Sequence, residues 1–72
     1  MNTKKLKVLD VVALLKDIPA KNLVSGQVGT LVEELDENIF EVEFCNNKGE
    51  TIAMASIEAE NLLVLHYALE TA

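Results

Sequence analysis

The stretch of the chain that decides its fold reads IFEVEFC, residues 39–45. Apolar and acidic side chains alternate in its centre. The apolar ones are Phe40, Val42 and Phe44, and the acids are Glu41 and Glu43. Strict alternation is typical of a strand with one face on a core and the other in solvent. We therefore predict a strand, with the three apolar side chains in the core.

A further strand is predicted on each side of this segment. Residues 27–35 come before it, separated by Asp36-Glu37-Asn38, a gap of hairpin size. Residues 51–57 come after the turn-forming sequence NNKG, in which Gly49 stands where a positive φ is often needed. Gly26 and Gly29 bracket the start of the first of these strands. The sequence predicts a three-stranded antiparallel meander, with Val28 joining the three apolar residues of the central strand in the core.

The two ends of the chain allow two interpretations. Residues 11–15 form a β-branched and aliphatic run, and residues 58–61 fit one helical turn before a short last strand at 62–66. Both ends also fit helical spacing, which gives an α+β alternative: the antiparallel meander with terminal helices. We favour strands at both ends, and therefore a mostly β fold.

The length and composition restrict the chain to one small domain, residues 1–72. Half of the 72 residues are apolar. We expect residues 1–7 to form a flexible N-terminal segment and residues 67–72 a C-terminal tail. One cysteine excludes an internal disulfide, and one histidine in addition excludes a Cys/His zinc site, so no cofactor is expected.

The charge argues against several classes of function. The net charge is -6 and all six basic residues are lysine, which disfavours nucleic acid as a partner. No apolar run is long enough to cross a bilayer, and the lack of a signal segment and of disulfides predicts a cytoplasmic protein without a membrane partner. No spacing identifies a catalytic group. We interpret His66 as a partly buried structural residue, and we expect that the protein is not an enzyme.

The acidity is concentrated in one part of the sequence. Residues 1–24 carry a net charge of +3, whereas residues 25–72 carry -9. Six acids fall on or between the second and third predicted strands. They are Glu33, Glu34, Asp36, Glu37, Glu41 and Glu43. Strand alternation separates such carboxylates, which disfavours a metal site. They serve either solubility or the recognition of a basic partner protein.

Four segments of the chain carry a resemblance to a known family. They are LDVVAL at 9–14, LVSGQVGT at 23–30, FEVEF at 40–44 and AENLL at 59–63. In this order they resemble a family of small bacterial proteins, domain-of-unknown-function family 4926, over residues 9–64. The pattern is also similar to the SH3-like barrels. The resemblance implies a five-stranded SH3-like barrel with a helical turn before the last strand, in which Gly26 and Gly29 allow a sharp bend and a close backbone approach.

The resemblance also implies a class of partner. Members of this family look like the antitoxin or immunity partners of small toxic proteins, so the acids would cover a basic cleft on a toxin. The alternative is an SH3-like docking module that binds through residues 16–25 and 62–65. A third possibility is a homo-oligomer formed through Tyr67 and Leu69 of the tail.

Overall fold

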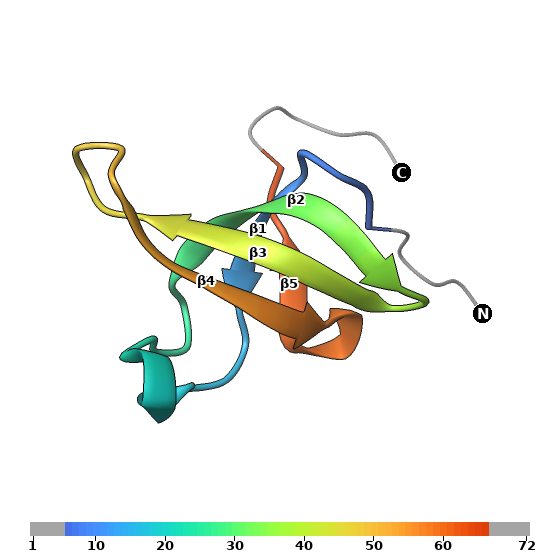
Figure 1. The fold of residues 1–72 in the computed structure, drawn as a ribbon, viewed down its shortest axis with the longest axis horizontal. Helices are drawn as coiled ribbons and strands as arrows, with labels where there is room; N and C mark the ends of the chain where they lie inside the picture. The colour runs from blue at the N-terminus through green and yellow to red at the C-terminus, as the bar shows by residue number, and fades with distance from the viewer. Residues whose placement is uncertain (1–5, 67–72) are drawn as a thin grey trace.

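The computed structural model describes residues 6–66, which form one antiparallel sheet of five strands (Figure 1). The strands are β1 (Val11–Leu14), β2 (Val28–Asp36), β3 (Ile39–Cys45), β4 (Thr51–Glu58) and β5 (Leu62–Val64). Two 3-10 turns complete the fold, η1 (Pro19–Lys21) in the first long loop and η2 (Ala59–Asn61) before β5. The order of strands across the sheet is β4-β3-β2-β1-β5.

The predicted mostly β fold is confirmed, and the alternative with terminal helices is wrong. Residues 11–14 pair with β2 on one side and with β5 on the other, so both edges of this short segment are hydrogen-bonded. A helix would satisfy its own backbone groups and leave the last strand without a partner. Five of the ten predicted strand limits coincide with the observed ones, and the other five differ by one or two residues.

The sheet curls around the core but does not close. β4 pairs with β3 and β5 pairs with β1, and within residues 6–66 no pairing joins β4 to β5. Within the described residues the five strands thus form one open, curled sheet, and the barrel that the resemblance implied is neither closed by pairing nor contradicted. The cause is local: β5 has only three residues, and they are committed to β1. β4 consequently keeps a free edge.

The core lies on the concave side of this sheet. Its ten buried residues are Val12, Leu14, Leu23, Leu31, Phe40, Val42, Phe44, Ala55, Ile57 and Leu62. The predicted burial of Phe40, Val42 and Phe44 is confirmed. The prediction for Val28 is wrong, since its side chain is 47% exposed. Gly29 pairs with Phe44, so alternation along β2 turns Gly29 and Leu31 inward and Val28 outward.

Each of the three glycines has a different structural role from an ordinary strand residue. A methyl group on Gly29 would lie 2.8 Å from both Phe44 Cδ1 and Val42 Cγ1 and 2.9 Å from the carbonyl oxygen of Glu43. The expected close approach at Gly29 is thus a contact with the core. Gly26 and Gly49 have φ values of +96° and +82°, which suits the bend before β2 and the β3–β4 turn.

Two expectations fall outside the described residues. The C-terminal tail, with Tyr67 and Leu69, begins after residue 66, and most of the expected N-terminal segment precedes residue 6. Within residues 6–66, no helix has the length and apolar character that a bilayer crossing requires.

Candidate functional site

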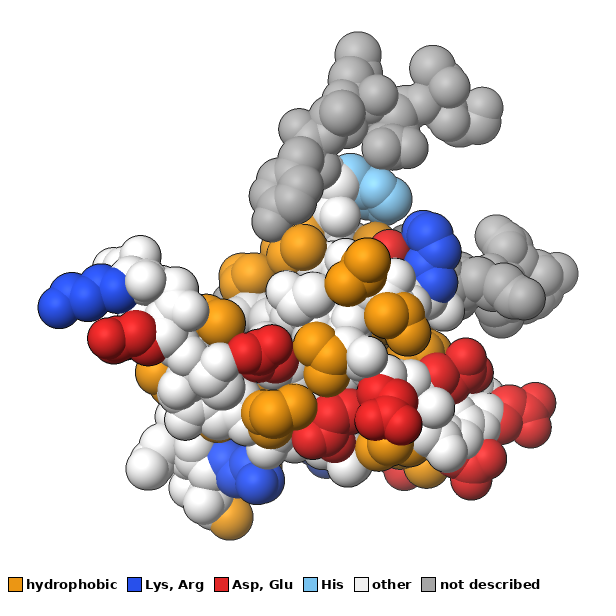
Figure 2. Space-filling view, turned by 45° about the horizontal axis from the view of Figure 1, so that its top comes forward, with side chains coloured by type: hydrophobic (Ala, Val, Ile, Leu, Met, Phe, Trp, Pro, Cys, Tyr) orange, Lys and Arg blue, Asp and Glu red, His pale blue; other side chains and the backbone are white. Residues whose placement is uncertain are grey.

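The six predicted acids lie on the β2–β3 hairpin, and most of them are near its turn. Figure 2 shows acidic side chains gathered at that end of the molecule, beside an apolar centre. Glu41 and Glu43 are half-buried on the outer face of β3, and the other four are exposed. We call these six residues, Glu33, Glu34, Asp36, Glu37, Glu41 and Glu43, the acidic surface.

Two carboxylates of the acidic surface face each other across the hairpin. Glu33 of β2 is the direct cross-strand partner of Glu41 of β3. Leu31 pairs with the inward-facing Val42, and two residues later Glu33 pairs with Glu41, the next residue back along β3. The extra residue of β2 is an irregularity in register, and it brings Glu33 directly opposite Glu41. Like charges opposite one another on a sheet destabilise it, so this arrangement has a cost in folding free energy.

Hydroxyl groups of β4 bind the two acids of β3. The Ser56 hydroxyl donates a hydrogen bond of 3.1 Å to Glu41 Oε1, and the Thr51 hydroxyl donates one to Glu43 Oε2. These bonds orient the carboxylates over the outer face of β4. Because both donors are neutral, they bring no positive charge to this face.

Asp36 has a structural role in the turn. Its Oδ1 accepts a hydrogen bond of 2.7 Å from the backbone N–H of Glu37, and Asn38 follows with φ of +65°. The backbone N–H of Ala59 then donates to the Asn38 carbonyl at 2.8 Å, which attaches η2 to the hairpin turn. The turn that carries Glu37 is thus held at both sides.

The acidic surface does not form one cluster. Glu34 pairs with Phe40, whose side chain faces the core, so Glu34 lies on the opposite face of the hairpin from Glu33 and Glu41. One further acid does belong with them: Glu58, at the end of β4, pairs with Ile39 on the outer face. Alternation in residues 51–58 could have predicted this. Ala55 and Ile57 are apolar and face inward, so Glu58 is expected on the outer face.

No lysine neutralises this surface within the described part of the chain. The Lys7 ammonium forms an ion pair of 3.1 Å with Asp10, and none of the six acids has such a contact with a described lysine. In the described chain, Lys16 and Lys21 belong to the first long loop and Lys48 to the β3–β4 turn. Near the hairpin turn, the six acids on the β2–β3 hairpin thus have no ion-pair partner among the described lysines.

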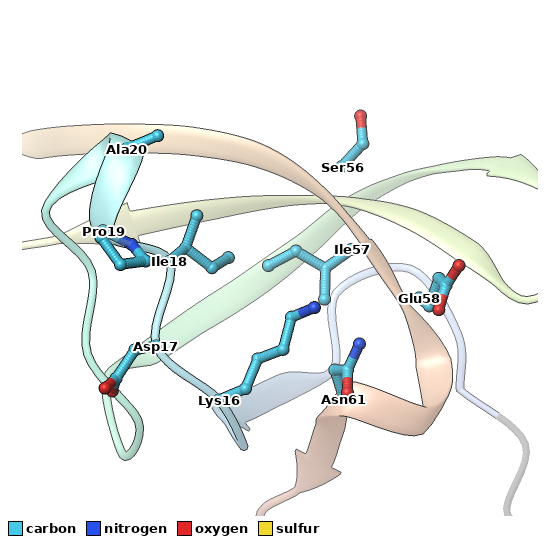
Figure 3. Close-up of a pocket in the computed structure, with 9 residues that line it drawn as sticks. All are labelled: Lys16, Asp17, Ile18, Pro19, Ala20, Ser56, Ile57, Glu58 and Asn61. Atoms are coloured by element: carbon cyan, nitrogen blue, oxygen red, sulfur yellow. The ribbon is translucent and has the colours of Figure 1, made fainter.

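A cleft of about 410 Å³ lies beside β4 (Figure 3). The residues 16–20 form one wall, and residues 56–58 together with Asn61 form the other. In Figure 3, Ile18 and Ile57 point toward each other, whereas Ser56 points to the far side of β4. Ile57 is buried and Ile18 half-buried, so the floor of the cleft is apolar and continuous with the core.

The alternative docking surface was expected to combine residues 16–25 with residues 62–65, and the fold does not bring these two segments together in one cleft. The residues 16–20 line the cleft as part of the predicted loop, but their neighbours across it come from β4 and η2 and not from residues 62–65. Leu62 is buried in the core and Leu63 is 46% exposed. In the later part of the loop, Leu23 is buried, and the Asp17 carboxylate accepts a 2.8 Å hydrogen bond from the Ser25 N–H.

Residues 6–66 include the only histidine and the only cysteine of the chain. They contain no group of three or more His, Cys, Asp or Glu side chains placed to hold a metal ion. His66 is exposed, which corrects the expectation of partial burial, and Cys45 is exposed as well. The described surface presents carboxylates, an apolar cleft and a free strand edge.

Comparison with known proteins identifies one family. A family model described as "Domain of unknown function (DUF4926)" matches residues 8–64, which is most of the chain. No curated protein and no solved structure matches the chain.

Proposed function

We propose that this chain, which belongs to the DUF4926 family, is a non-catalytic protein-binding module whose acidic surface binds a basic partner protein. The observation that carries the proposal is the cross-strand pair of Glu33 and Glu41. The pair lowers stability, and no described lysine compensates for it. A basic partner would remove the repulsion on binding, so the cost in the free protein becomes a gain in the complex.

The rest of the surface fits the same role. Net charge alone would keep the protein dispersed in solution wherever the acids stood, and it does not require two of them to face each other. A negative region concentrated at one end of a small domain steers a positively charged partner to that end and raises the association rate. Binding of this kind weakens as salt concentration increases.

The more specific form of the proposal concerns the class of partner. We take the partner to be a small basic toxin of the cytoplasm, and the chain to act as its antitoxin or immunity protein by occupying a cleft that otherwise holds phosphate groups. The exposed carboxylates of Glu33 and Glu37 supply the charge that phosphates would supply.

The test begins with the product of the neighbouring reading frame, co-expressed with this chain. We expect a small basic protein that co-purifies with it and that inhibits growth when produced alone. Binding is then measured for the Glu33→Lys variant at two salt concentrations. We expect a loss of about tenfold or more in affinity, and a smaller dependence on salt, because one carboxylate becomes a cation.

Glu50→Lys is the matched control. It makes the same change in net charge at the opposite end of β3 and β4, where the Glu50 carboxylate accepts a hydrogen bond from Asn46 Nδ2. Equal losses for the two variants would show that only total charge matters. Unchanged affinity in Glu33→Lys would disprove the role of the acidic surface.

A further inference from the structure

We propose that the free edge of β4 accepts an extended segment of the partner as a sixth strand, with basic side chains on the outer face and apolar side chains in the cleft. This inference rests on the proposed function, because it names the way in which the basic partner binds. It adds a backbone interaction that charge alone does not provide. Strand addition of this kind obtains affinity from main-chain hydrogen bonds and specificity from alternate side chains.

The backbone of β4 has bonding groups to spare. Seven of its eight residues pair with β3 on one side, with Ile52 skipped at an irregularity in register, and within residues 6–66 its backbone has no partner on the other side. In an antiparallel pair, alternate N–H and C=O groups point away from the partner strand. The edge is regular over residues 53–58, and this stretch is therefore a template for another strand.

The sequence of β4 does not protect this edge. Natural edge strands carry lysine, proline or an inward-pointing charge, or they are very short. β4 reads TIAMASIE and has a single charge, at its last residue, Glu58. The other edge of the sheet contrasts with it, because β5 has three residues. β5 is thus protected by its shortness, whereas residues 53–58 of β4 carry no lysine, no proline and no irregularity in register.

The cleft lies on the unpaired side of β4. None of the residues that line it comes from β3, and its far wall is formed by residues 16–20 of the first long loop. Figure 3 shows Ile18, Pro19 and Ile57 around this space, with the Lys16 side chain extending along it toward Ile57. The inward side chains of an added strand would enter it, and the apolar floor at Ile57 and Ile18 favours aliphatic ones.

The outer face beside the edge is negative. Glu41 and Glu43 are held over β4 by the hydroxyl groups of Ser56 and Thr51, and Glu58 ends the strand itself. An added strand would lie about 4.8 Å from β4, so its outward side chains would approach these carboxylates. Lysine or arginine at the outward positions of the added strand would be attracted to these carboxylates. The expected segment therefore alternates basic and aliphatic residues.

Charge also decides between a basic partner and a second copy of this chain. Two copies joined edge to edge at β4 would bring two sets of Glu41, Glu43 and Glu58 together, on molecules that each carry a net charge of -6. Such repulsion opposes pairing, whereas a basic segment is attracted. We therefore assign the edge to the partner.

The experiment uses the whole chain and synthetic peptides with blocked ends. The probe is the alternating peptide KVKVKVKV, which matches β4 in length, and the control is the block peptide KKKKVVVV, which has the same charge without alternation. We expect the alternating peptide to bind at least about tenfold more tightly than the control, because it alone presents one basic and one apolar face. Amide chemical shifts should change along residues 51–58 and around Ile18.

Two N-methylated versions of the alternating peptide test the backbone bonds without changing the protein. Methylation of the valine backbone nitrogens blocks one edge of the peptide, and methylation of the lysine backbone nitrogens blocks the other. One set should abolish binding and the other should leave the affinity within about threefold, since an added strand bonds through a single edge. If both sets bind equally, no strand is added.

The remaining outcomes are distinct. Equal binding of the two unmethylated peptides, with shifts confined to the acidic surface, would overturn the added strand and leave the proposed function standing. Failure of both peptides would also overturn it. A chain that dimerises in light scattering, with β4 amides protected from hydrogen exchange before peptide is added, would assign the edge to a second copy. The proposed function fails separately, when Glu33→Lys binds the partner as the wild type does.

Discussion

The β2–β3 hairpin contains two regions that follow different physical rules. At its base Gly29 pairs with Phe44, and the contact is so close that a single added methyl group would overlap the core. Nearer the turn, Glu33 pairs with Glu41, and two like charges face each other with no described lysine in contact. The same two strands thus contain one region whose packing raises the unfolding free energy and another whose like charges lower it. The second region is where we expect selection for binding.

The largest effect should come from the base of the hairpin. Phe44 is fully buried, and Phe44→Ala should cost about 3–5 kcal/mol of unfolding free energy through lost burial and a cavity. A chain of this size has a total of only about 5–15 kcal/mol, so the variant should be partly or largely unfolded. Urea unfolding followed by circular dichroism measures this. A cooperative melt near the wild-type temperature would contradict the assignment of Phe44 to the core.

Gly29→Ala should have the next largest effect. The new methyl group meets Phe44, Val42 and the backbone carbonyl of Glu43, and the resulting overpacking should cost about 1–3 kcal/mol. The same measurement applies. Phe44→Leu is the diagnostic background, because a smaller neighbour should relieve part of the overlap and make the two costs less than additive. Strict additivity would show that Phe44 does not cause the cost and that Val42 or the Glu43 carbonyl does.

Glu33→Lys should have the opposite sign at the turn end of the hairpin. It replaces a like-charge pair by a pair of opposite charges, the new ammonium and the Glu41 carboxylate, which should raise the unfolding free energy by about 0.2–1 kcal/mol at low salt. The gain should shrink as salt is added. The variant then combines greater stability with weaker partner binding. A loss of stability would mean that Glu33 makes a favourable contact and that the two regions do not differ as we describe.

The smallest effect is expected at Val28, on the outer face of the base. Val28→Ala removes only half-exposed apolar surface, so the change in unfolding free energy should stay within about 0.5 kcal/mol. Val42→Ala, one strand away on the inner face, is the matched control and should cost several times more. Similar losses for the two valines would place Val28 in the core after all.

The strands were predictable because their patterns are local. Alternation in residues 39–45 predicted both the strand and its buried face, and the compositions of the two turns predicted the meander. Val28 was misplaced because a β-branched residue next to a glycine carries no information about which way β2 faces. The partner strand decides that, through the pairing of Gly29 with Phe44.

The candidate site was predictable only as a set of residues. The sequence contains six acids on this hairpin but does not specify their grouping, because two irregularities in register within β2 decide which face each acid occupies. One brings Glu33 opposite Glu41, and Glu34 is left with Phe40 on the other face. No sequence pattern indicated the cleft or the free edge of β4, because both depend on how segments far apart in the chain approach each other.

The sequence by itself determined the fold class, the order of the strands along the chain, the family and the negative charge of the later part, because each follows from composition or from a short-range pattern. Only the tertiary structure decided that the sheet stays open, that Gly29 gives room to Phe44 and that Glu33 faces Glu41. These features depend on register and on the pairing of distant strands. A shift of one residue reverses the face of every side chain in a strand, and no local pattern specifies where a bulge absorbs that shift.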